Sequence, residues 1–361
     1  MPKVKVDGVE LEVPAGATVL QACELAGKEI PRFCYHERLS IAGNCRMCLV
    51  EVKPGPPKPQ ASCALPAADN QEIFTQTEMV KKAREGVMEF LLINHPLDCP
   101  ICDQAGECKL QEYSVEHGQP ESRFAEVKVH KPKAVDLGPR ITLDAERCVM
   151  CTRCIRFTAD VAGDDALGIV NRGSYNAIST YPGQPFDNNY TLNTVDICPV
   201  GALTSDDFRF QMRVWFLKET KSLCTGCGTG CNTVIGSREN RMYRYEPRQN
   251  DAVNSCWMCD AGRLDYKWIG RDDRLAKVRG PQGDTIWPSA LQEISERLAK
   301  AGEGSVAVVA SARQTNEELF LLNKLAKRFK ALTDSVPRKG EADHLLVAGD
   351  RNPNTTGARL T

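Results

Sequence analysis

The sequence has no excess of charge of one sign and no long hydrophobic segment. Its 46 Lys and Arg residues balance 47 Asp and Glu residues, leaving a net charge of -1, which argues against a broad nucleic-acid-binding surface. The longest apolar runs, residues 90–93 and 306–310, fall far short of the roughly 20 residues that a membrane-spanning helix needs. Met1 is followed by alternating residues rather than an apolar h-region, so we expect no secretory signal.

Cysteine is absent beyond Cys259, although the chain contains 17 cysteines. An odd number of cysteines in a chain without a secretory signal fits a disulfide framework poorly, whereas clustered cysteines in a reducing compartment indicate metal binding. The sequence also lacks a Walker A motif, and its Gly-x-Gly-x-Gly stretch at 226–230 lacks the strand and helix of a dinucleotide-binding loop. We therefore expect metal chemistry without a nucleotide site.

The first group of cysteines has the spacing C-x10-C-x2-C-x14-C and consists of Cys34, Cys45, Cys48 and Cys63. Alternation over residues 4–11 predicts a hairpin, residues 19–26 after Thr18 predict a capped helix, and residues 49–52 and 60–63 predict two strands. This order is typical of a β-grasp ferredoxin. Plant-type 2Fe–2S sites also combine a close C-x2-C pair with a distant fourth cysteine. We interpret the group as a 2Fe–2S site, with structural zinc as the alternative.

The second group combines one histidine with three cysteines: His95, Cys99, Cys102 and Cys108. An apolar stripe over residues 77–92 predicts a helix with Thr77 as its N-cap, and Pro96 must end that helix beside His95. Because three cysteines follow at ligand spacing, we interpret His95 as a ligand rather than as an ordinary surface or core histidine. This donor set permits zinc and equally permits a 4Fe–4S cluster.

The third group contains a close triple and a distant partner: Cys148, Cys151, Cys154 and Cys198. C-x2-C-x2-C opens the bacterial ferredoxin run, and zinc ribbons use C-x2-C pairs instead. Phe157-Thr158 stands where a two-cluster ferredoxin would continue with another cysteine. The group therefore predicts one 4Fe–4S cluster.

The fourth group contains one cysteine more than a cluster needs: Cys224, Cys227, Cys231, Cys256 and Cys259. Gly226, Gly228 and Gly230 would let the backbone approach a cluster and point N–H groups at sulfur. On spacing alone, Cys256 and Cys259 compete for the fourth ligand position. Cys23 lies on the apolar face of the first predicted helix and is expected to be a core residue.

Two of these motifs resemble one protein family. His-Pro-Leu-Asp-Cys-Pro-Ile-Cys-Asp at 95–103 with Gly-Glu-Cys at 106–108, and the run at 148–158, resemble the large iron–sulfur subunit of bacterial NADH:quinone oxidoreductase, respiratory complex I. The resemblance implies one 2Fe–2S cluster on the first group and three 4Fe–4S clusters on the others. In family members with the last cluster the fourth cysteine follows after 27 residues, which implies Cys259 as the ligand and Cys256 as a spare.

The resemblance covers residues 1 to about 270 and implies an α+β multidomain chain. The expected domains are a β-grasp 2Fe–2S domain (1–76), a helical His/Cys3 segment (77–135), a ferredoxin-like 4Fe–4S domain (136–215), a molybdopterin-oxidoreductase-type 4Fe–4S domain (216–275) and a partial doubly wound α/β domain (276–361).

The pattern of residues 276–361 predicts alternating helices and strands. We expect a helix at 287–299, a strand at 306–310, a helix at 315–329 and a strand at 345–349, as at the start of a doubly wound domain. The stretch resembles the first part of the family's molybdopterin-oxidoreductase-like domain. Since the chain stops soon after that strand, we expect either a shortened family member or a fragment.

The resemblance further implies an electron-transfer subunit with no catalytic residue of its own. NADH and FMN would bind a partner subunit, and the other neighbours would include quinone-proximal iron–sulfur subunits of the complex. The chain would lie on the cytoplasmic side of the bacterial inner membrane, touching the membrane only through the complex, with no nucleic acid bound. Arg46 and Arg153 are candidates for tuning cluster potentials, and a solvated surface position is the equally weighted alternative for both.

Three other functions fit parts of the pattern. NAD-linked molybdenum formate dehydrogenases share the domain order, but they typically place Lys where Ala261 stands and often use a metal-bound Cys that residues 260–361 lack, so no molybdopterin is expected. They also carry extra ferredoxin cysteines near the position of Thr158. The electron-transfer subunit of an NAD-linked hydrogenase fits the first 200 residues but not the fourth cysteine group. A zinc-binding structural protein conflicts with the C-x2-C-x2-C triple.

Overall fold

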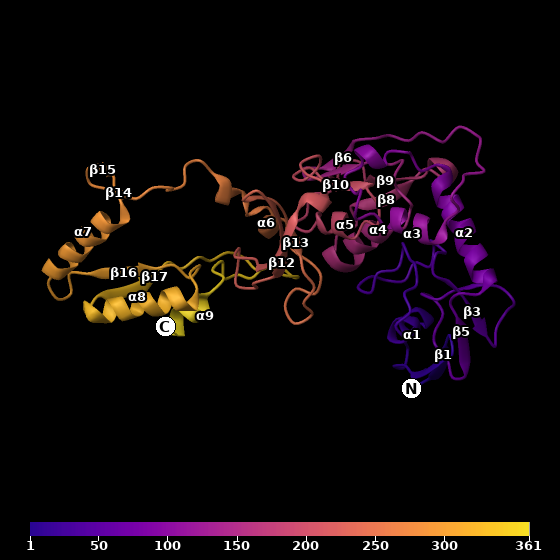
Figure 1. Cartoon of the computed structure of the whole chain (residues 1–361), viewed down its shortest axis with the longest axis horizontal. Coiled ribbons are helices and arrows are strands. Elements are labelled where there is room, and N and C mark those ends of the chain that lie inside the picture. Colours follow the sequence, from indigo (N-terminus) through magenta and orange to yellow (C-terminus); the bar gives the residue numbers. More distant parts are fainter. Residues whose placement is uncertain (361) are drawn as a thin grey trace. The chain divides into compact units, whose positions relative to one another are not determined.

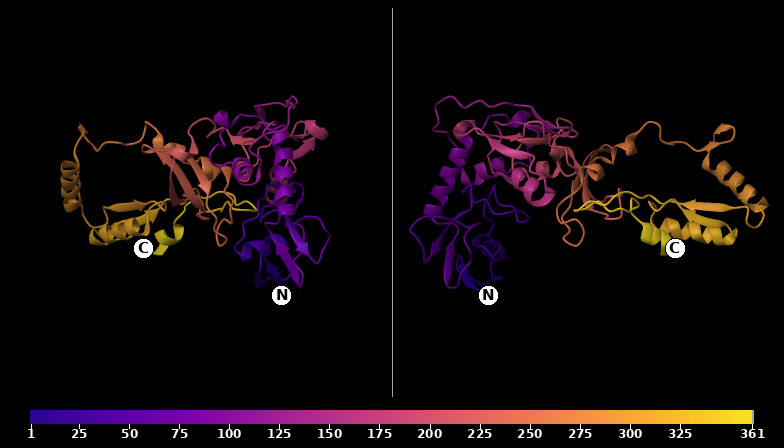
Figure 2. Two further views of the ribbon diagram at one scale, coloured as in Figure 1. Left: turned by 45° about the vertical axis from the view of Figure 1, so that its right-hand side comes forward. Right: turned by 180° about the vertical axis from the view of Figure 1, so that it is seen from behind.

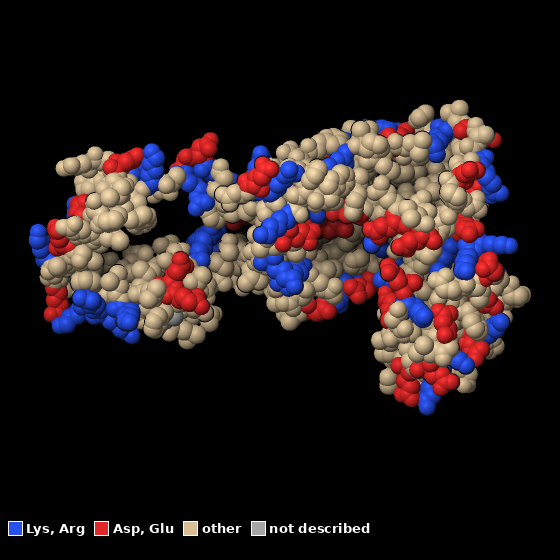
Figure 3. Space-filling model, viewed as in Figure 1, with Lys and Arg blue, Asp and Glu red and all other residues tan. Residues whose placement is uncertain are grey.

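The computed structural model describes residues 1–360 of the chain, and these divide into two compact units, residues 1–217 and 218–360. Both units mix helices with strands (Figure 1, Figure 2). Lys and Arg side chains lie among Asp and Glu side chains on the face drawn in Figure 3. Within residues 1–360, none of the helices combines the length and the apolar character required to span a bilayer.

The first unit begins with the predicted β-grasp arrangement, a five-stranded sheet with one helix packed on it. The sheet has the order β2-β1-β5-β3-β4, in which β1 and β5 are parallel and the other neighbours antiparallel. Thr18 forms a capping box with Gln21 at the start of α1, and Cys23 is fully buried in the core, as predicted. The elements are β1 (Lys3–Val6), β2 (Val9–Glu12), α1 (Val19–Leu25), β3 (Leu49–Lys53), β4 (Gln60–Ala61) and β5 (Gln71–Phe74).

Helix α2 (Glu78–Ile93) packs on β3 and confirms the predicted helix. Thr77 caps it by accepting a hydrogen bond from the Val80 amide at 3.3 Å. One face of α2 carries Arg84, which is only 1% exposed and donates from Nε and Nη2 to the Leu49 carbonyl at 3.2 and 2.9 Å. A buried cation thus links α2 to the strand that follows Cys48.

We expect Arg84→Ala to lower the free energy of unfolding by about 3 kcal/mol, because it removes a buried side chain and leaves the Leu49 carbonyl without its donor. Urea unfolding followed by circular dichroism measures the change. Lys82→Ala on the exposed side of the same helix is the matched control and should change stability little. Equal stability of the two variants would show that the Arg84 contacts contribute nothing net.

The remainder of the first unit combines short helices with two small sheets. One sheet has the order β10-β7-β6, and β8 pairs with β9 as an antiparallel hairpin. Helix α4 runs directly into a π-helical turn, Thr158–Ala162. The elements are α3 (Lys109–His117), β6 (Val135–Gly138), β7 (Ile141–Leu143), α4 (Arg153–Phe157), β8 (Leu167–Val170), β9 (Ala177–Thr180), α5 (Asn193–Asp196) and β10 (Leu203–Ser205).

The second unit contains an antiparallel sheet, β11-β12-β13, and a β-α-β element in which β16 and β17 pair in parallel around α8. Thr315 forms a capping box with Glu318 at the start of α8. The elements are β11 (Lys218–Leu223), β12 (Asn232–Arg238), β13 (Arg241–Pro247), α6 (Asp260–Leu264), β14 (Arg279–Gly280), β15 (Gly283–Asp284), α7 (Trp287–Lys300), β16 (Ala307–Ala310), α8 (Asn316–Arg328), β17 (Leu332–Ser335) and α9 (Thr355–Leu360).

The strand predicted at 345–349 is wrong, whereas the other predicted elements of this region are confirmed. The second strand of the parallel pair is β17, whose polar sequence Leu-Thr-Asp-Ser hides it from a search for apolar runs. In the apolar stretch at 345–347 the backbone N–H groups bond to the Asp343 carboxylate at 2.9–3.0 Å. This side chain satisfies the donors that a neighbouring strand would otherwise have to satisfy.

Candidate metal centres

The first predicted ligand set comes together in the β-grasp domain. Hydrogen bonds join the Cys34 thiol to those of Cys45 and Cys63, and another joins Cys48 to Cys63. These bonds hold the pKa of Cys34 and Cys48 low and raise the pKa of Cys45 and Cys63. The four thiols therefore form one continuous row, in the order Cys45, Cys34, Cys63 and Cys48. Four thiols gathered in this way are the number of ligands that a 2Fe–2S cluster requires.

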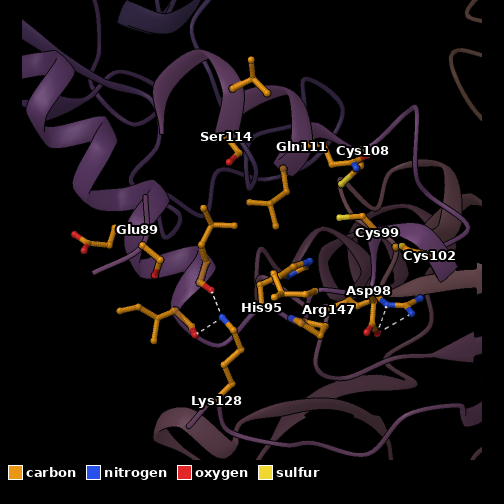
Figure 4. A pocket seen from close by; sticks show the side chains of 18 of the residues that line it. Glu89, His95, Asp98, Cys99, Cys102, Cys108, Gln111, Ser114, Lys128 and Arg147 are labelled. Atoms are coloured by element: carbon orange, nitrogen blue, oxygen red, sulfur yellow. Dashed lines mark hydrogen bonds and ion pairs between the residues drawn. The ribbon is translucent and has the colours of Figure 1, made fainter. Parts of the chain in front are cut away.

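The second set lines a cavity of about 470 Å³ that contains His95, Cys99, Cys102 and Cys108 in its wall (Figure 4). Burial lowers the pKa of His95 to about 4, helped by the positive charges of Arg147 and Lys128. The imidazole is therefore neutral at pH 7, as a metal ligand must be. Burial raises the pKa of Cys102, and it raises that of Cys108 to about 11.

The third set, Cys148, Cys151, Cys154 and Cys198, lines one small enclosed space together with Val200 and Leu203. Burial is the largest cause of the raised pKa of all four thiols, which reaches about 12 at Cys148 and about 11 at Cys151. Buried thiols resist ionisation on their own, whereas a bound metal centre keeps them as thiolates. Their clustering is therefore suited to a positively charged centre.

The fourth set brings Cys259 to the three cysteines of the 224–231 loop. Burial and the neighbouring thiols Cys224, Cys259 and Cys227 raise the pKa of Cys231 to about 12. The sulfurs of Cys259 and Cys224 both lie close to Gly262. A Cβ built on this glycine would lie 3.1 Å from the sulfur of Cys259 and 3.2 Å from that of Cys224. Cys259 is buried, whereas Cys256 is only partly buried.

Backbone amides point at the sulfurs in all four sets. In six cases the amide two residues after the cysteine donates to its sulfur, for example from Met150 to Cys148 and from Gly226 to Cys224, each at 3.4 Å. Such bonds stabilise negative charge on sulfur and raise a cluster's reduction potential. The six pairs are Cys45 with Met47, Cys102 with Gln104, Cys148 with Met150, Cys151 with Arg153, Cys198 with Val200, and Cys224 with Gly226.

The loops between the ligands hold strained backbone. Arg46, Met150 and Thr152 lie between successive cysteines and have positive φ values of 59°, 53° and 61°. Residues other than glycine adopt this region at a cost of about 1–2 kcal/mol each, and such residues cluster at functional sites. Arg46 is exposed, which agrees with a solvated surface position rather than contact with a cluster.

An ion-pair network ties the second ligand loop to the third. Asp98, the residue before Cys99, accepts hydrogen bonds from Arg147, the residue before Cys148, at 2.9 and 3.3 Å. Arg147 also pairs with Asp144 at 3.2 Å, and Lys133 pairs with Asp98 at 2.5 Å. Arg147 is 6% exposed, so its pairs with Asp98 and Asp144 are shielded from solvent and hold the two loops together, whereas the Lys133 side chain is 43% exposed.

The donor chemistry of all four sets fits iron–sulfur clusters. Thiolate is the ligand that iron–sulfur centres prefer, and a neutral imidazole can replace one of them. Among residues 1–360 no three His, Cys, Asp or Glu side chains converge tightly enough to hold a single metal ion. A cluster spreads its ligands over several iron atoms, so wider spacing is compatible with cluster binding.

Sequence reasoning missed several residues that shape these sites. A Cβ on Gly201 would lie 2.3 Å from the Cys102 sulfur, so the loop after Cys198 forms part of the wall of the second site. The amide of Lys109 also donates to the Pro199 carbonyl at 3.0 Å. No local sequence signal marks contacts between segments about 100 residues apart, although the conformational freedom of glycine is a general hint.

Family models match the chain along its first three quarters. They are described as a 2Fe-2S iron-sulfur cluster binding domain (residues 2–78), an NADH-ubiquinone oxidoreductase-G iron-sulfur binding region (84–123), an NADH-quinone oxidoreductase subunit 3 ferredoxin-like domain (138–204) and a molybdopterin oxidoreductase Fe4S4 domain (217–269). Each of the four ligand sets includes residues within one of these matches.

Curated relatives match nearly the whole chain. The G subunit of the NADH-quinone oxidoreductase of Rickettsia conorii is 44% identical over 100% of this chain and 54% of its own length. The NADH-ubiquinone oxidoreductase 75 kDa subunit of Reclinomonas americana is 46% identical over 93% of this chain and 50% of its own length. The chain thus spans about half the length of the curated relatives it matches.

A solved structure shares part of the fold. A chain from the crystal structure of an NAD+-reducing [NiFe]-hydrogenase in the H2-reduced state aligns with a TM-score of 0.53 and 29% identity, over 59% of this chain and 91% of its own.

Proposed function

The chain belongs to the family of the G subunit, or 75 kDa subunit, of NADH-quinone oxidoreductase, and we propose that it carries electrons through iron–sulfur clusters from an NADH-oxidising site on a partner towards quinone. The observation that carries this proposal is the contiguity of three ligand sets within the first unit. Iron–sulfur clusters supply one-electron transfer without bond rearrangement at the protein. No residue of the chain is assigned a catalytic role.

Within the first unit, the third ligand set contacts both of the other two. Arg156 Nη2 donates to the carbonyls of both Cys34 and Cys151, so the first and third sets are neighbours. Gly201, three residues after Cys198, lies against Cys102, so the third and second sets are neighbours. The third set therefore adjoins both of the others, and such contiguity is what an electron relay requires.

The residues of the chain have three tasks in this function. The thiolates of the four sets, with His95, hold the clusters: one 2Fe–2S cluster on the first set and one 4Fe–4S cluster on each of the others. The backbone amides stabilise charge on sulfur and so adjust the potentials. Most of the ligand cysteines are buried or partly buried, which limits the access of water to the clusters, although Cys99 is exposed. The neutral state of His95 leaves its ring nitrogen free to bind iron.

We further propose the domain boundaries predicted from the sequence, 1–76, 77–135, 136–215, 216–275 and 276–361. Expected partners are the NADH- and FMN-binding subunit and the quinone-proximal iron–sulfur subunits. The chain would act at the cytoplasmic face of the bacterial inner membrane.

The likeness to the hydrogenase chain favours one rival function, the electron-transfer part of an NAD-linked hydrogenase. That likeness extends over only 59% of this chain. An NAD-linked molybdenum formate dehydrogenase is the remaining rival.

Anaerobic analysis of iron, sulfide, zinc and molybdenum, with EPR spectra after dithionite reduction, tests the proposal. We expect about 14 iron atoms per chain and no molybdenum, since one 2Fe–2S and three 4Fe–4S clusters contain that number. Molybdenum in the full-length protein would favour the formate dehydrogenase. Zinc with little iron, in protein never exposed to oxygen, would exclude an electron-transfer role.

Removal of iron should unfold the cysteine-rich segments selectively. The β-grasp domain has an extensive apolar core, whereas the buried cluster around the fourth set consists of Cys224, Cys231, Tyr245 and Met258. A segment with so small a core, half of whose buried residues are ligands, depends on the metal for folding. We expect anaerobic chelation to open residues 218–270 to protease before residues 1–76, as mass spectrometry of the fragments would show. Equal protection of both segments would contradict this dependence.

A further inference from the structure

Two arginines of α4 connect the ligand loops of the first and third sets. Arg153 Nη1 donates to the Ile197 carbonyl at 3.1 Å, next to Cys198, and Nη2 donates to the Tyr35 carbonyl at 2.5 Å, next to Cys34. One guanidinium thus contacts the backbone beside a ligand of each set. Because Arg153 begins α4 within the C-x2-C-x2-C run, its position is fixed by the third loop itself.

Arg156, one turn later on the same helix, reinforces this connection. Its Nη1 donates to the Ser40 carbonyl, and its Nη2 donates to the carbonyls of Cys34 and Cys151. Ser40 is held in addition by the Asp160 carboxylate, which accepts its amide at 2.9 Å. The two guanidinium groups therefore donate to five backbone carbonyls in the loops of the first and third sets. We call this pair of side chains, Arg153 and Arg156, the clamp.

The clamp introduces positive charge without a matching carboxylate. Within the described residues neither Arg153 nor Arg156 forms an ion pair. The Nε of Arg153 is inaccessible to solvent and has no hydrogen-bond partner. A buried N–H donor without an acceptor is unfavourable, and an electron-rich group between the two loops would remove that cost. Among the thiols, Cys151, Cys198 and Cys34 interact with the charge of Arg153.

We propose that Arg153 is a positioning and tuning residue shared by two redox centres, holding the loops of the first and third sets together and raising the reduction potential of both clusters. The inference rests on the proposed function, because it requires clusters at both sets. Reduction adds negative charge to a cluster, and a nearby cation in a medium of low dielectric constant stabilises the reduced state. One charge placed between two centres acts on both in the same direction.

EPR-monitored redox titration of the full-length protein in its native assembly tests this proposal. Arg153→Gln and Arg153→Met remove the charge, and Arg153→Lys retains it. The signals are assigned by their loss in Cys48→Ser and Cys151→Ser variants. At a fixed solution potential, we expect the two neutral variants to decrease the reduced-to-oxidised ratio of both clusters by on the order of tenfold. This is equivalent to lowering each reduction potential by about 59 mV for one electron. Arg153→Lys should retain most of the wild-type ratio.

Arg172→Gln is the matched control, because it removes one positive charge from an exposed position of the same domain. The signal of the His95 set provides an internal reference that should not shift. Wild-type potentials at both sites in either cluster-loaded neutral variant would overturn the role of Arg153, and so would a shift at one site only. Absence of clusters from the wild-type protein would instead overturn the proposed function. If Arg153→Gln does not load clusters, Arg153→Met gives the same comparison.

Discussion

Gly201→Ala is expected to remove the cluster of the second set while leaving the other clusters in place. A Cβ at this position would lie 2.3 Å from the Cys102 sulfur and 3.0 Å from the Cβ of Gln104. Real Cβ atoms do not approach other heavy atoms so closely, and the sulfur must therefore leave its place in the cavity wall. We expect iron to fall by about four atoms per chain, with loss of one 4Fe–4S signal from the EPR spectrum.

Gly86→Ala in α2 is the matched control for this substitution. Nothing lies within 4 Å of a Cβ built on Gly86, which is inside a helix. It should keep all the iron and stabilise the protein by about 0.5–1 kcal/mol, because alanine favours helix more than glycine does. Full iron and an unchanged spectrum in Gly201→Ala would show that the cluster does not depend on the present position of Cys102.

Candidate ligand sets can be proposed from the sequence more readily than their surroundings, for a physical reason. Ligand spacing is local, because a C-x2-C turn must wrap one centre, so Cys148, Cys151 and Cys154 can be recognised without knowledge of the fold. Hairpin, capping and helix signals at Thr18 and Thr77 are local in the same way, and the structure confirms those elements. Strand β17 carries no such local signal. Its sequence is polar, and its extended conformation depends on pairing with β16, which lies earlier in the chain.

The contacts between ligand sets could not be predicted because they join segments far apart in the sequence. Arg153 bonds to the carbonyl of Tyr35, 118 positions earlier. Arg46 and Arg153 both lie inside a C-x2-C pair, Arg46 directly after the first cysteine and Arg153 directly before the second, yet Arg46 is exposed and Arg153 has a solvent-inaccessible Nε. The contacts of α4 with the first loop, which the sequence does not reveal, bury Arg153. Spacing likewise left two candidates, Cys256 and Cys259, for the last ligand.

Cys259→Ser is expected to remove the fourth cluster, whereas Cys256→Ser should keep it. The Cys259 sulfur lies at the start of α6, where it accepts the Gly262 amide at 3.3 Å, and it faces Cys224 across Gly262. Serine is itself a good N-cap, so the substitution preserves the start of the helix and removes the soft sulfur ligand. The comparison therefore separates loss of the sulfur ligand from loss of the helix cap.

Iron content and EPR of the two variants, purified anaerobically side by side, decide the assignment. Cys259→Ser should have about four iron atoms fewer than wild type and should expose residues 218–270 to protease, since the buried cluster there contains two ligand cysteines, Cys224 and Cys231. Cys256→Ser should match wild type in both measurements. The reverse pattern would make Cys256 the ligand, and it would require the 256–259 turn to rotate so that the partly buried thiol replaces the buried one.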